Sequence, residues 1–587
     1  MPREPLETMG DRDLLDEHEH GDSVSFAPPP QETASGQEGD WSAVYQDGIP
    51  GHPAWLAAKY QAAGYWENDT ITSRLDRIIA ERPQATALVD GVCRISYAQL
   101  GSYIGACASA LSGLGIGPGD AVAVQLPNWW EQLVAVFAIV QVGAMVVPVN
   151  VRLRGELEYI LEYTRSKLVI APDEYHGFSH GDLIDSLRGK LPDLRETVTV
   201  RGTADRRHAT FEELLAQGSS HPVVTGRTVL SANDPWEVMF TSGTTSAPKG
   251  VVLTHNNTLY TLRLLVEEYH ILQGDGTDVV LAVLPIAFVY AQYLCALAAL
   301  LTGGTLVLQE SFDATELMDL VERERVTLVA LVPSMVPTFQ HGADLRARDL
   351  SSLRIVAPAG EAVTRERKAE LFEIFGCDVR ECYGLAEVTM PLVQPADATQ
   401  EQKLSSTGRR NPATELRIVD DEGHDLGVGE IGELLVRGPT LFPGYYQNPE
   451  ATTKAIDEAG WFHTGDLVAR DTNGFYAISG RKKDLIKRGG ASILPQDIED
   501  ALEGHPAVAA VTAFALPDER RGEIACACVV LKAGTSASAE ELLGYLRARI
   551  ATFKVPERIE FVESLPLSAN GKVLKQELAA RFAARSA

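Results

Sequence analysis

Hydroxyl and glycine residues crowd one short segment, residues 240–251, whose sequence is FTSGTTSAPKGV. Five Ser or Thr side chains lead up to Lys249, and apolar residues on each side predict two strands. Hydroxyls and backbone N–H groups that converge between two strands can hold an anion, which a lysine then neutralises. A Walker phosphate loop is excluded because Gly250, not Ser or Thr, follows Lys249. The segment predicts a phosphate-binding loop; the alternative is a flexible surface turn without a ligand.

Eight further motifs accompany this loop along the chain. They are YAQL at 97–100, VGAMVVPVN at 142–150, LPIAFVY at 284–290, YGLAE at 383–387, GELLVRGP at 432–439, WFHTGD at 461–466, GRKKDLI at 480–486 and NGK at 570–572. Each resembles a motif of the adenylate-forming superfamily, which includes acyl-CoA synthetases, aryl-acid AMP ligases, nonribosomal adenylation domains and luciferases. The loop resembles the ATP-phosphate loop of that superfamily, and the nine motifs follow its order over residues 50–587.

The resemblance implies an α/β fold with two domains and a defined reaction. A large N-terminal domain of helix-flanked mixed and parallel sheets would carry a β-rich subdomain, and a small mobile α+β domain would follow it. The alternation of helical and strand patterns from Trp55 onward independently favours parallel sheets flanked by helices. The implied activity is that of an AMP-forming acid–thiol ligase, which uses ATP, Mg²⁺ and CoA. A carboxylic acid would first form acyl-AMP with release of pyrophosphate, and CoA would then take the acyl group as AMP leaves.

The resemblance assigns three catalytic residues. Lys249 is expected to neutralise the β and γ phosphates, and Lys572 to bridge the acyl carboxylate and the α-phosphate. Glu387 is expected to hold Mg²⁺, since a carboxylate is a hard oxygen ligand. A solvated lysine in a turn is the alternative for Lys572, and Lys575 is close enough to be its rival.

The same resemblance assigns the remaining nucleotide contacts. Tyr383 is expected to stack on adenine, and Asp466 to accept both ribose hydroxyls, because two acceptor oxygens suit a diol. A turn residue is the alternative for Asp466. Thr244 would be a second metal ligand. The other expected contacts are Thr241, Ser242, Gly243, Thr245, Ala359, Gly360, Glu361, Gly384 and Arg481.

Residue patterns and the resemblance together predict the domain boundaries. Acidic residues, PPP at 28–30 and a Gly/Ser/Gln-rich patch predict a disordered tail at 1–48. Turn residues at 421–423 and 473–474, between short alternating runs, predict a β-rich subdomain at 415–480. The resemblance implies an N-terminal domain at 49–480 and a C-terminal lid at 485–587. Lys483 and Asp484 would form the hinge at 481–484, about which the lid turns between the two half-reactions. Arg488, Gly489 and Gly490 are expected to line the CoA tunnel.

The acyl pocket is expected at Phe288, Val289, Gly384 and Leu385. Phe288 replaces a histidine common in relatives, and Val289 replaces the asparagine that reads a ring hydroxyl in hydroxybenzoate-activating ligases. Because both polar groups are absent, an apolar cyclic, aromatic or medium-chain acid is the expected substrate. Ser246 and Ala359 depart mildly from the pattern, and Ala386 lacks a hydroxyl contact to phosphate that a threonine often supplies in relatives. The alternatives are an enzyme that loads the phosphopantetheine arm of a carrier protein, a half-reaction enzyme working with a partner, and a non-catalytic binding protein.

Composition excludes some partners. The net charge of −28 argues against nucleic acid, and residues 1–50 alone hold 12 acidic and 2 basic side chains. The uncharged stretch 279–308 is interrupted by Pro285, Gln292 and two glycines, so we expect a buried strand and a buried helix instead of a membrane span. Seven cysteines without CxxC spacing predict reduced thiols in a cytoplasmic protein. We also expect a monomer or homodimer.

Overall fold

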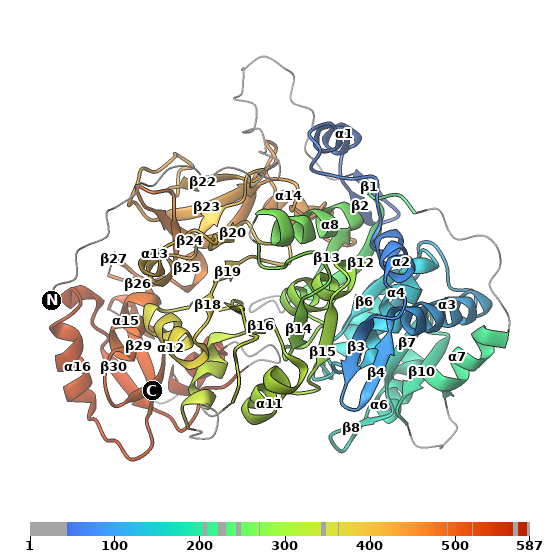
Figure 1. The fold of residues 1–587 in the computed structure, drawn as a ribbon. Coiled ribbons are helices and arrows are strands. Elements are labelled where there is room, and N and C mark those ends of the chain that lie inside the picture. Colours follow the sequence, from blue (N-terminus) through green and yellow to red (C-terminus); the bar gives the residue numbers. More distant parts are fainter. Residues whose placement is uncertain are drawn as a thin grey trace, which may run out of the picture. The chain divides into compact units, whose positions relative to one another are not determined.

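Figure 1 shows the ribbon of the computed structural model. The first described element is a hairpin of β1 (Val44–Gln46) and β2 (Ile49–Gly51), closed by Asp47 and Gly48, which both have positive φ. An Asp-Gly pair is the usual choice for such a tight turn. Most of the predicted acidic tail lies outside the described residues, but its last residues form this hairpin. The structure describes residues 44–202, 208–220, 230–241, 248–268, 270–341, 348–361, 363–489, 491–518, 520–567 and 573–583.

A first seven-stranded sheet carries the strands around the predicted phosphate loop. Its strands pair in parallel, apart from the antiparallel pair β12–β13 at one edge. The central strands are buried along their whole length, as expected for a parallel sheet covered on both faces. In sheet order the strands are β11 (Ala209–Thr210), β10 (Glu196–Val200), β7 (Leu168–Pro172), β5 (Ala121–Val124), β6 (Met145–Pro148), β12 (Pro235–Thr241) and β13 (Lys249–Thr254).

A second seven-stranded sheet has the same plan, with an antiparallel pair, β3–β4, at one edge. The uncharged stretch 279–308 enters it as a buried strand, a broken helix and a second strand, so the predicted buried strand and helix are confirmed. None of the helices in the described residues is long and apolar enough to cross a membrane. The strands, in sheet order, are β18 (Asp378–Val379), β17 (Ile355–Pro358), β16 (Leu328–Leu331), β14 (Val279–Ala282), β15 (Thr305–Leu308), β3 (Thr86–Asp90) and β4 (Cys93–Ser96).

Several helices of this body begin at side chains that cap them. The N-caps Thr70, Ser96 and Thr254 each accept a hydrogen bond from the backbone three residues on, which satisfies an otherwise unpaired N–H. Thr254 ends β13, so α8 begins directly after the strand that follows the phosphate loop. The helices are α1 (Ala54–Ala62), α2 (Ile71–Glu81), α3 (Tyr97–Gly113), α4 (Trp130–Gln141), α5 (Leu157–Thr164), α6 (His180–Leu187), α7 (Phe211–Ser220), α8 (His255–Arg263), α9 (Val289–Ala291), η3 (Gln292–Leu297), α10 (Ala298–Leu301), α11 (Ala314–Glu324) and α12 (Arg365–Phe375).

Residues 415–481 form a four-stranded antiparallel sheet, in agreement with the predicted β-rich region. A smaller three-stranded sheet precedes it and contains Tyr383. The strands are β19 (Cys382–Tyr383), β20 (Leu392–Val393), β21 (Arg409–Arg410), β22 (Glu415–Val419), β23 (Gly432–Arg437), β24 (Phe462–Arg470) and β25 (Tyr476–Arg481), with helices α13 (Gln400–Ser405) and α14 (Pro449–Ala455).

The last part of the chain, drawn in orange to red in Figure 1, packs around apolar clusters of its own. Ile486, Ile498 and Leu542 belong to one such cluster, and Phe514 and Phe582 to another. The α+β character expected of this segment is present. Its elements are η6 (Lys482–Asp484), β26 (Ile486–Arg488), β27 (Ala491–Ile493), α15 (Pro495–Glu503), β28 (Val508–Asp518), β29 (Gly522–Leu531), α16 (Ala539–Arg547), β30 (Arg558–Phe561) and α17 (Lys575–Ala583).

Candidate active site

The two strands that flank the predicted phosphate loop bring its ends together. Thr241 and Lys249 are direct partners in the antiparallel pair β12–β13. Tyr159, on α5, donates a hydrogen bond of 3.2 Å to the Pro248 carbonyl and holds the loop exit. Gly250 is required here because a Cβ would lie 2.8 Å from the Val238 side chain. Ser242, Gly243, Thr244 and Thr245 lie outside the described residues, so their predicted contacts stay predictions.

Lys249 and Glu387 meet across a tyrosine that sequence reasoning missed. The Lys249 ammonium lies 4.7 Å from the centre of the Tyr445 ring, within the range of a cation–π contact. The Tyr445 hydroxyl donates a hydrogen bond of 2.8 Å to the Glu387 carboxylate. We call these three residues the Lys249 group.

The Glu387 carboxylate is buried among these partners. Burial raises its pKa, while the Tyr445 hydrogen bond and the charges of Lys249 and Arg481 act in the opposite direction. Burial and the neighbouring Glu387 raise the pKa of Tyr445, so its hydroxyl keeps its proton and remains a donor. An acid in this setting, with cations beside it, has the donor chemistry that a divalent metal on a phosphate needs.

Tyr383, Asp466 and Arg481 form a second cluster, the Asp466 group. Asp466 and Arg481 are direct partners in the pair β24–β25, and Arg481 Nε lies 3.0 Å from Asp466 Oδ1. The Tyr383 hydroxyl donates a 2.5 Å hydrogen bond to Asp466 Oδ2. Burial lowers the pKa of Arg481, but Asp466 and Tyr383 outweigh it and the pKa is raised. The carboxylate has further lone pairs for additional donors.

The two groups lie within electrostatic reach of each other. Glu387 is among the charges that raise the pKa of Arg481, and Arg481 in turn lowers that of Glu387. Lys249, Glu387, Asp466 and Arg481 therefore lie close enough for their charges to interact, although they come from β13, the loop after β19, β24 and β25.

Predicted adenine residues directly follow β17, and predicted acyl-pocket residues lie at the start of α9. Ala359 is buried at the end of β17, and Gly360 follows with a positive φ of 86°. Tyr290, next to the predicted pocket residues Phe288 and Val289, donates a 2.5 Å hydrogen bond to the Ala357 carbonyl. The two segments are thereby joined. Glu361 and Leu385 are half-buried.

Gly384 is fixed by a close backbone contact. A Cβ at this position would lie 2.7 Å from the backbone nitrogen of Met390, so a side chain here would force the loop apart. The Leu385 N–H bonds the Val388 carbonyl in the same turn, 3.0 Å away. The turn that carries Glu387 is therefore tight and well defined.

The predicted hinge is a single 3₁₀ turn that contains Lys483 and Asp484. Its first residue, Lys482, pairs with Asp421 at 2.9 Å and with Glu433 on β23 at 3.0 Å. Sequence reasoning missed this anchor, which fixes the turn to the antiparallel sheet.

The predicted CoA-tunnel residues begin at Arg488, on β26. Its guanidinium donates to the Phe553 carbonyl at 2.7 Å and pairs with Glu557, so it holds the segment before β30. Gly489 has a positive φ of 55°, and Gly490 lies outside the described residues.

Lys572, the predicted bridging lysine, also lies outside the described residues. Its rival Lys575 lies at the start of α17 and pairs with Glu499 at 2.8 Å. Glu499 also accepts hydrogen bonds from Thr512 and from the Ala513 backbone. Lys575 is thus part of the packing of this segment.

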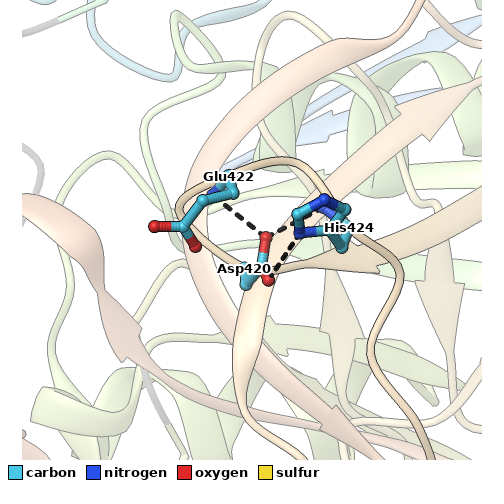
Figure 2. Close-up of side chains that lie close together, drawn as sticks. All are labelled: Asp420, Glu422 and His424. Carbon is cyan, nitrogen blue, oxygen red and sulfur yellow. Dashed lines mark hydrogen bonds and ion pairs between the residues drawn. The ribbon is translucent and has the colours of Figure 1, made fainter.

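Asp420, Glu422 and His424 form a group of potential metal ligands between β22 and β23 (Figure 2). The Asp420 carboxylate accepts hydrogen bonds from the backbone of Glu422 and His424, at 3.0 and 2.8 Å, and lies 3.2 Å from the His424 ring. These bonds are typical of an aspartate that closes a turn. The group therefore stabilises the turn predicted at 421–423.

Comparisons with known proteins match nearly the whole chain. The model of a family described as AMP-binding enzyme matches residues 75–446, and one described as AMP-binding enzyme C-terminal domain matches 497–572. A 2-hydroxy-7-methoxy-5-methyl-1-naphthoate–CoA ligase of Streptomyces carzinostaticus is 33% identical over 538 residues, which are 90% of this chain and 96% of the relative. A 2,3-dihydroxybenzoate-AMP ligase of Bacillus subtilis is 32% identical over 90% of this chain and 96% of its own. The crystal structure of the anthranilate CoA ligase AuaEII with anthranoyl-AMP superposes with a TM-score of 0.81 at 26% identity, covering 88% of this chain and 98% of the other.

Proposed function

The chain belongs to the AMP-binding enzyme family, and we propose that it is an AMP-forming acyl-CoA synthetase. In the first half-reaction, a carboxylate oxygen of the acid attacks the α-phosphorus of ATP, and pyrophosphate leaves. In the second, the CoA sulfur attacks the acyl carbon, the thiol proton is lost, and AMP leaves. The resemblance drawn from the nine motifs and the predicted fold class are both confirmed.

The convergence of the Lys249 and Asp466 groups is the observation that carries this proposal. Asp466 accepts the ribose hydroxyls, Tyr383 stacks on adenine, and Arg481 contacts the ribose or a phosphate. Lys249 neutralises the outer phosphates, and Lys572 arrives from the C-terminal segment at the reacting carboxylate. Positive charge then surrounds the phosphorus oxygens where negative charge develops, which is the largest source of catalysis in such a transfer. The other predicted phosphate and adenine contacts complete this assignment.

Glu387 fits a role as a Mg²⁺ ligand, with Thr244 as the second protein ligand. The support is the buried carboxylate, which lies beside Lys249 and Arg481 at the expected phosphate position. Bound Mg²⁺ would neutralise the phosphate charge.

The second half-reaction needs access for CoA, and we assign it to the C-terminal segment. Residues 49–480 and 485–587 act as two domains, with Lys483 and Asp484 at the hinge. Turning the lid withdraws Lys572 and brings the loop at Arg488, Gly489 and Gly490 to the thiol channel. The separate apolar clusters of residues 486–583 support a unit that moves as one body.

An aromatic or related cyclic acid is the substrate that we propose. Phe288 and Val289 present no hydrogen-bonding side chain to the expected ring, and Leu385 adds a further apolar surface. The names of the three proteins compared above each include an aromatic acid: a naphthoate, a dihydroxybenzoate and an anthranilate. Medium-chain acids are the next class to test.

A carrier protein is the alternative acceptor of the acyl group. The Bacillus subtilis relative is named as an AMP ligase without mention of CoA, and Phe288 departs from the histidine common in relatives. In either case the protein acts as a monomer or homodimer.

Pyrophosphate release with a panel of carboxylic acids, with and without CoA, tests the proposal. We expect release that depends on one class of aromatic or cyclic acid, and AMP formation that depends on CoA. Hydroxylamine in place of CoA should trap the adenylate as a hydroxamate. Acid-dependent release without CoA turnover would instead favour a carrier protein. ATP binding without any acid-dependent release would favour a non-catalytic binding protein.

A further inference from the structure

The segment 441–446 joins the two motifs that carry Lys249 and Glu387. On one side, the Phe442 N–H bonds the Glu387 carbonyl at 2.8 Å, and Leu441 forms a bridge with Val388. On the other, the Tyr446 N–H bonds the Gly250 carbonyl at 2.7 Å. Six residues thus connect the phosphate-loop strand to the turn of the predicted metal ligand.

Tyr445 lies in the middle of this connection and directs its side chain between the two motifs. Its hydroxyl reaches the Glu387 carboxylate at 2.8 Å, and its ring faces the Lys249 ammonium at 4.7 Å. The two ends of one side chain thereby contact an anion and a cation from different strands. These two contacts fix where the carboxylate and the ammonium lie relative to each other.

The Tyr445 backbone is held on its other side, so the ring has a fixed origin. Its N–H bonds Thr452 Oγ1 at 2.9 Å, and its carbonyl accepts from the Tyr45 hydroxyl at 2.8 Å. The same Tyr45 hydroxyl lies 2.6 Å from Thr452 Oγ1. Since only 4% of Tyr445 is exposed, the side chain has little freedom to leave this position.

We propose that Tyr445 is a positioning residue that sets the Glu387 carboxylate and the Lys249 ammonium for binding of the ATP–metal complex. The hydroxyl binds Glu387 Oε1 and would leave Oε2 available to a metal, while the ring contacts the Lys249 ammonium. This inference rests on the proposed roles of Lys249 and Glu387.

Two variants separate the two contacts. Tyr445→Phe keeps the ring and removes the hydroxyl, whereas Tyr445→Leu removes both. ATP dissociation constants are measured by calorimetry on the full chain, once with EDTA and once with excess Mg²⁺. For Tyr445→Phe we expect unchanged metal-free binding and a loss of about tenfold in the affinity gained from Mg²⁺, as for a hydrogen bond to a charged group. For Tyr445→Leu we expect metal-free binding also to weaken, by about fivefold, because the cation–π contact is lost.

Tyr163→Phe is the matched control. Its hydroxyl donates a 2.8 Å hydrogen bond to the neighbouring Tyr446 carbonyl, without contact to Lys249 or Glu387. We expect it to keep the full affinity gain from Mg²⁺. Steady-state kinetics add a second readout: Tyr445→Phe should raise the KM for ATP and leave the KM for the acid unchanged.

An unchanged affinity gain from Mg²⁺ in Tyr445→Phe would overturn the inference while leaving the proposed function intact. Equal increases in both KM values would also overturn it, because they would indicate general damage to the fold. Failure of the wild-type chain to bind ATP would overturn the proposed function as well. If Tyr445→Leu does not fold, the phenylalanine variant decides the question alone.

Discussion

The Asp466 group and the Lys249 group hold charged side chains together in different ways. Asp466 contacts Arg481 and Tyr383 directly, and two of the three residues are partners in adjacent strands. Lys249 and Glu387 come from separate motifs and meet through Tyr445. Strand pairing builds the Asp466 group. The Lys249 group depends on a long-range contact through Tyr445 that none of the nine motifs predicts. Variants at the two groups should therefore affect the reaction differently.

The largest effect is expected at Lys572, which would complete the Lys249 group at the reacting end of the nucleotide. Lys572→Ala should slow acid-dependent pyrophosphate release by about 100- to 1,000-fold, because a charge that stabilises the transition state is lost. Thioester formation from preformed acyl-AMP should remain. Quenched-flow assays of each half-reaction measure the two rates.

Lys575→Ala is the control for this experiment, since Lys575 pairs with Glu499 within the C-terminal segment. It should retain pyrophosphate release at close to the wild-type rate. The reverse pattern, loss in Lys575→Ala and retention in Lys572→Ala, would exchange the two assignments.

A smaller effect is expected at Asp466, because its proposed contact with the ribose is made in the ATP complex as well as in the transition state. Asp466→Asn should raise the KM for ATP by about tenfold through the loss of charged hydrogen bonds, with a smaller change in kcat. The same variant should discriminate less between ATP and 2′-deoxy-ATP than the wild-type enzyme does. Discrimination that stays at the wild-type level would show that Asp466 does not bind the ribose hydroxyls.

The smallest effect concerns the anchor beside the Asp466 group, where Glu433 pairs with Lys482. The interaction with His463 and then that with Lys482 lower the pKa of Glu433 to about 2, although burial opposes them. A carboxyl whose pKa is depressed on folding stabilises the protein above its unfolded pKa, and the stabilisation is lost as the pH falls through the folded pKa.

Glu433→Gln should therefore lower the free energy of unfolding by about 1 kcal/mol near pH 6, a modest value because the site is partly open to solvent. The difference from the wild type should shrink as the pH falls from about 4.5 towards 2, the window between the unfolded and folded pKa values. Urea titrations across this range measure it. If the difference in the free energy of unfolding stayed constant down to pH 2, lost packing and not lost charge would explain the destabilisation.

The sequence was sufficient for the parts of this architecture that rest on local patterns. Apolar runs around the hydroxyl-rich loop predicted β12 and β13, and the turn residues between short alternating runs predicted the four-stranded sheet at 415–481. The resemblance assigned Asp466 and Arg481 to the same nucleotide, and the antiparallel pair β24–β25 makes them direct partners.

The same reasoning could not find Tyr445, Lys482 or Glu433. Tyr445 lies 58 residues from Glu387, and 49 residues separate Lys482 from Glu433. Such long-range contacts depend on how the sheets and loops pack, and local patterns in a single sequence do not reveal that packing. The only local signal was the PGYY run after GELLVRGPTLF, where two aromatic residues follow a turn and both become buried.

A crystal structure with ATP, Mg²⁺ and a non-reactive acid analogue tests the central claim most directly. The account predicts the ribose hydroxyls on the Asp466 carboxylate, the adenine beside Tyr383, and the outer phosphates between Lys249 and the metal held by Glu387. A nucleotide bound elsewhere, or one whose phosphates lie away from Lys249 and Glu387 while its ribose contacts Asp466, would contradict it.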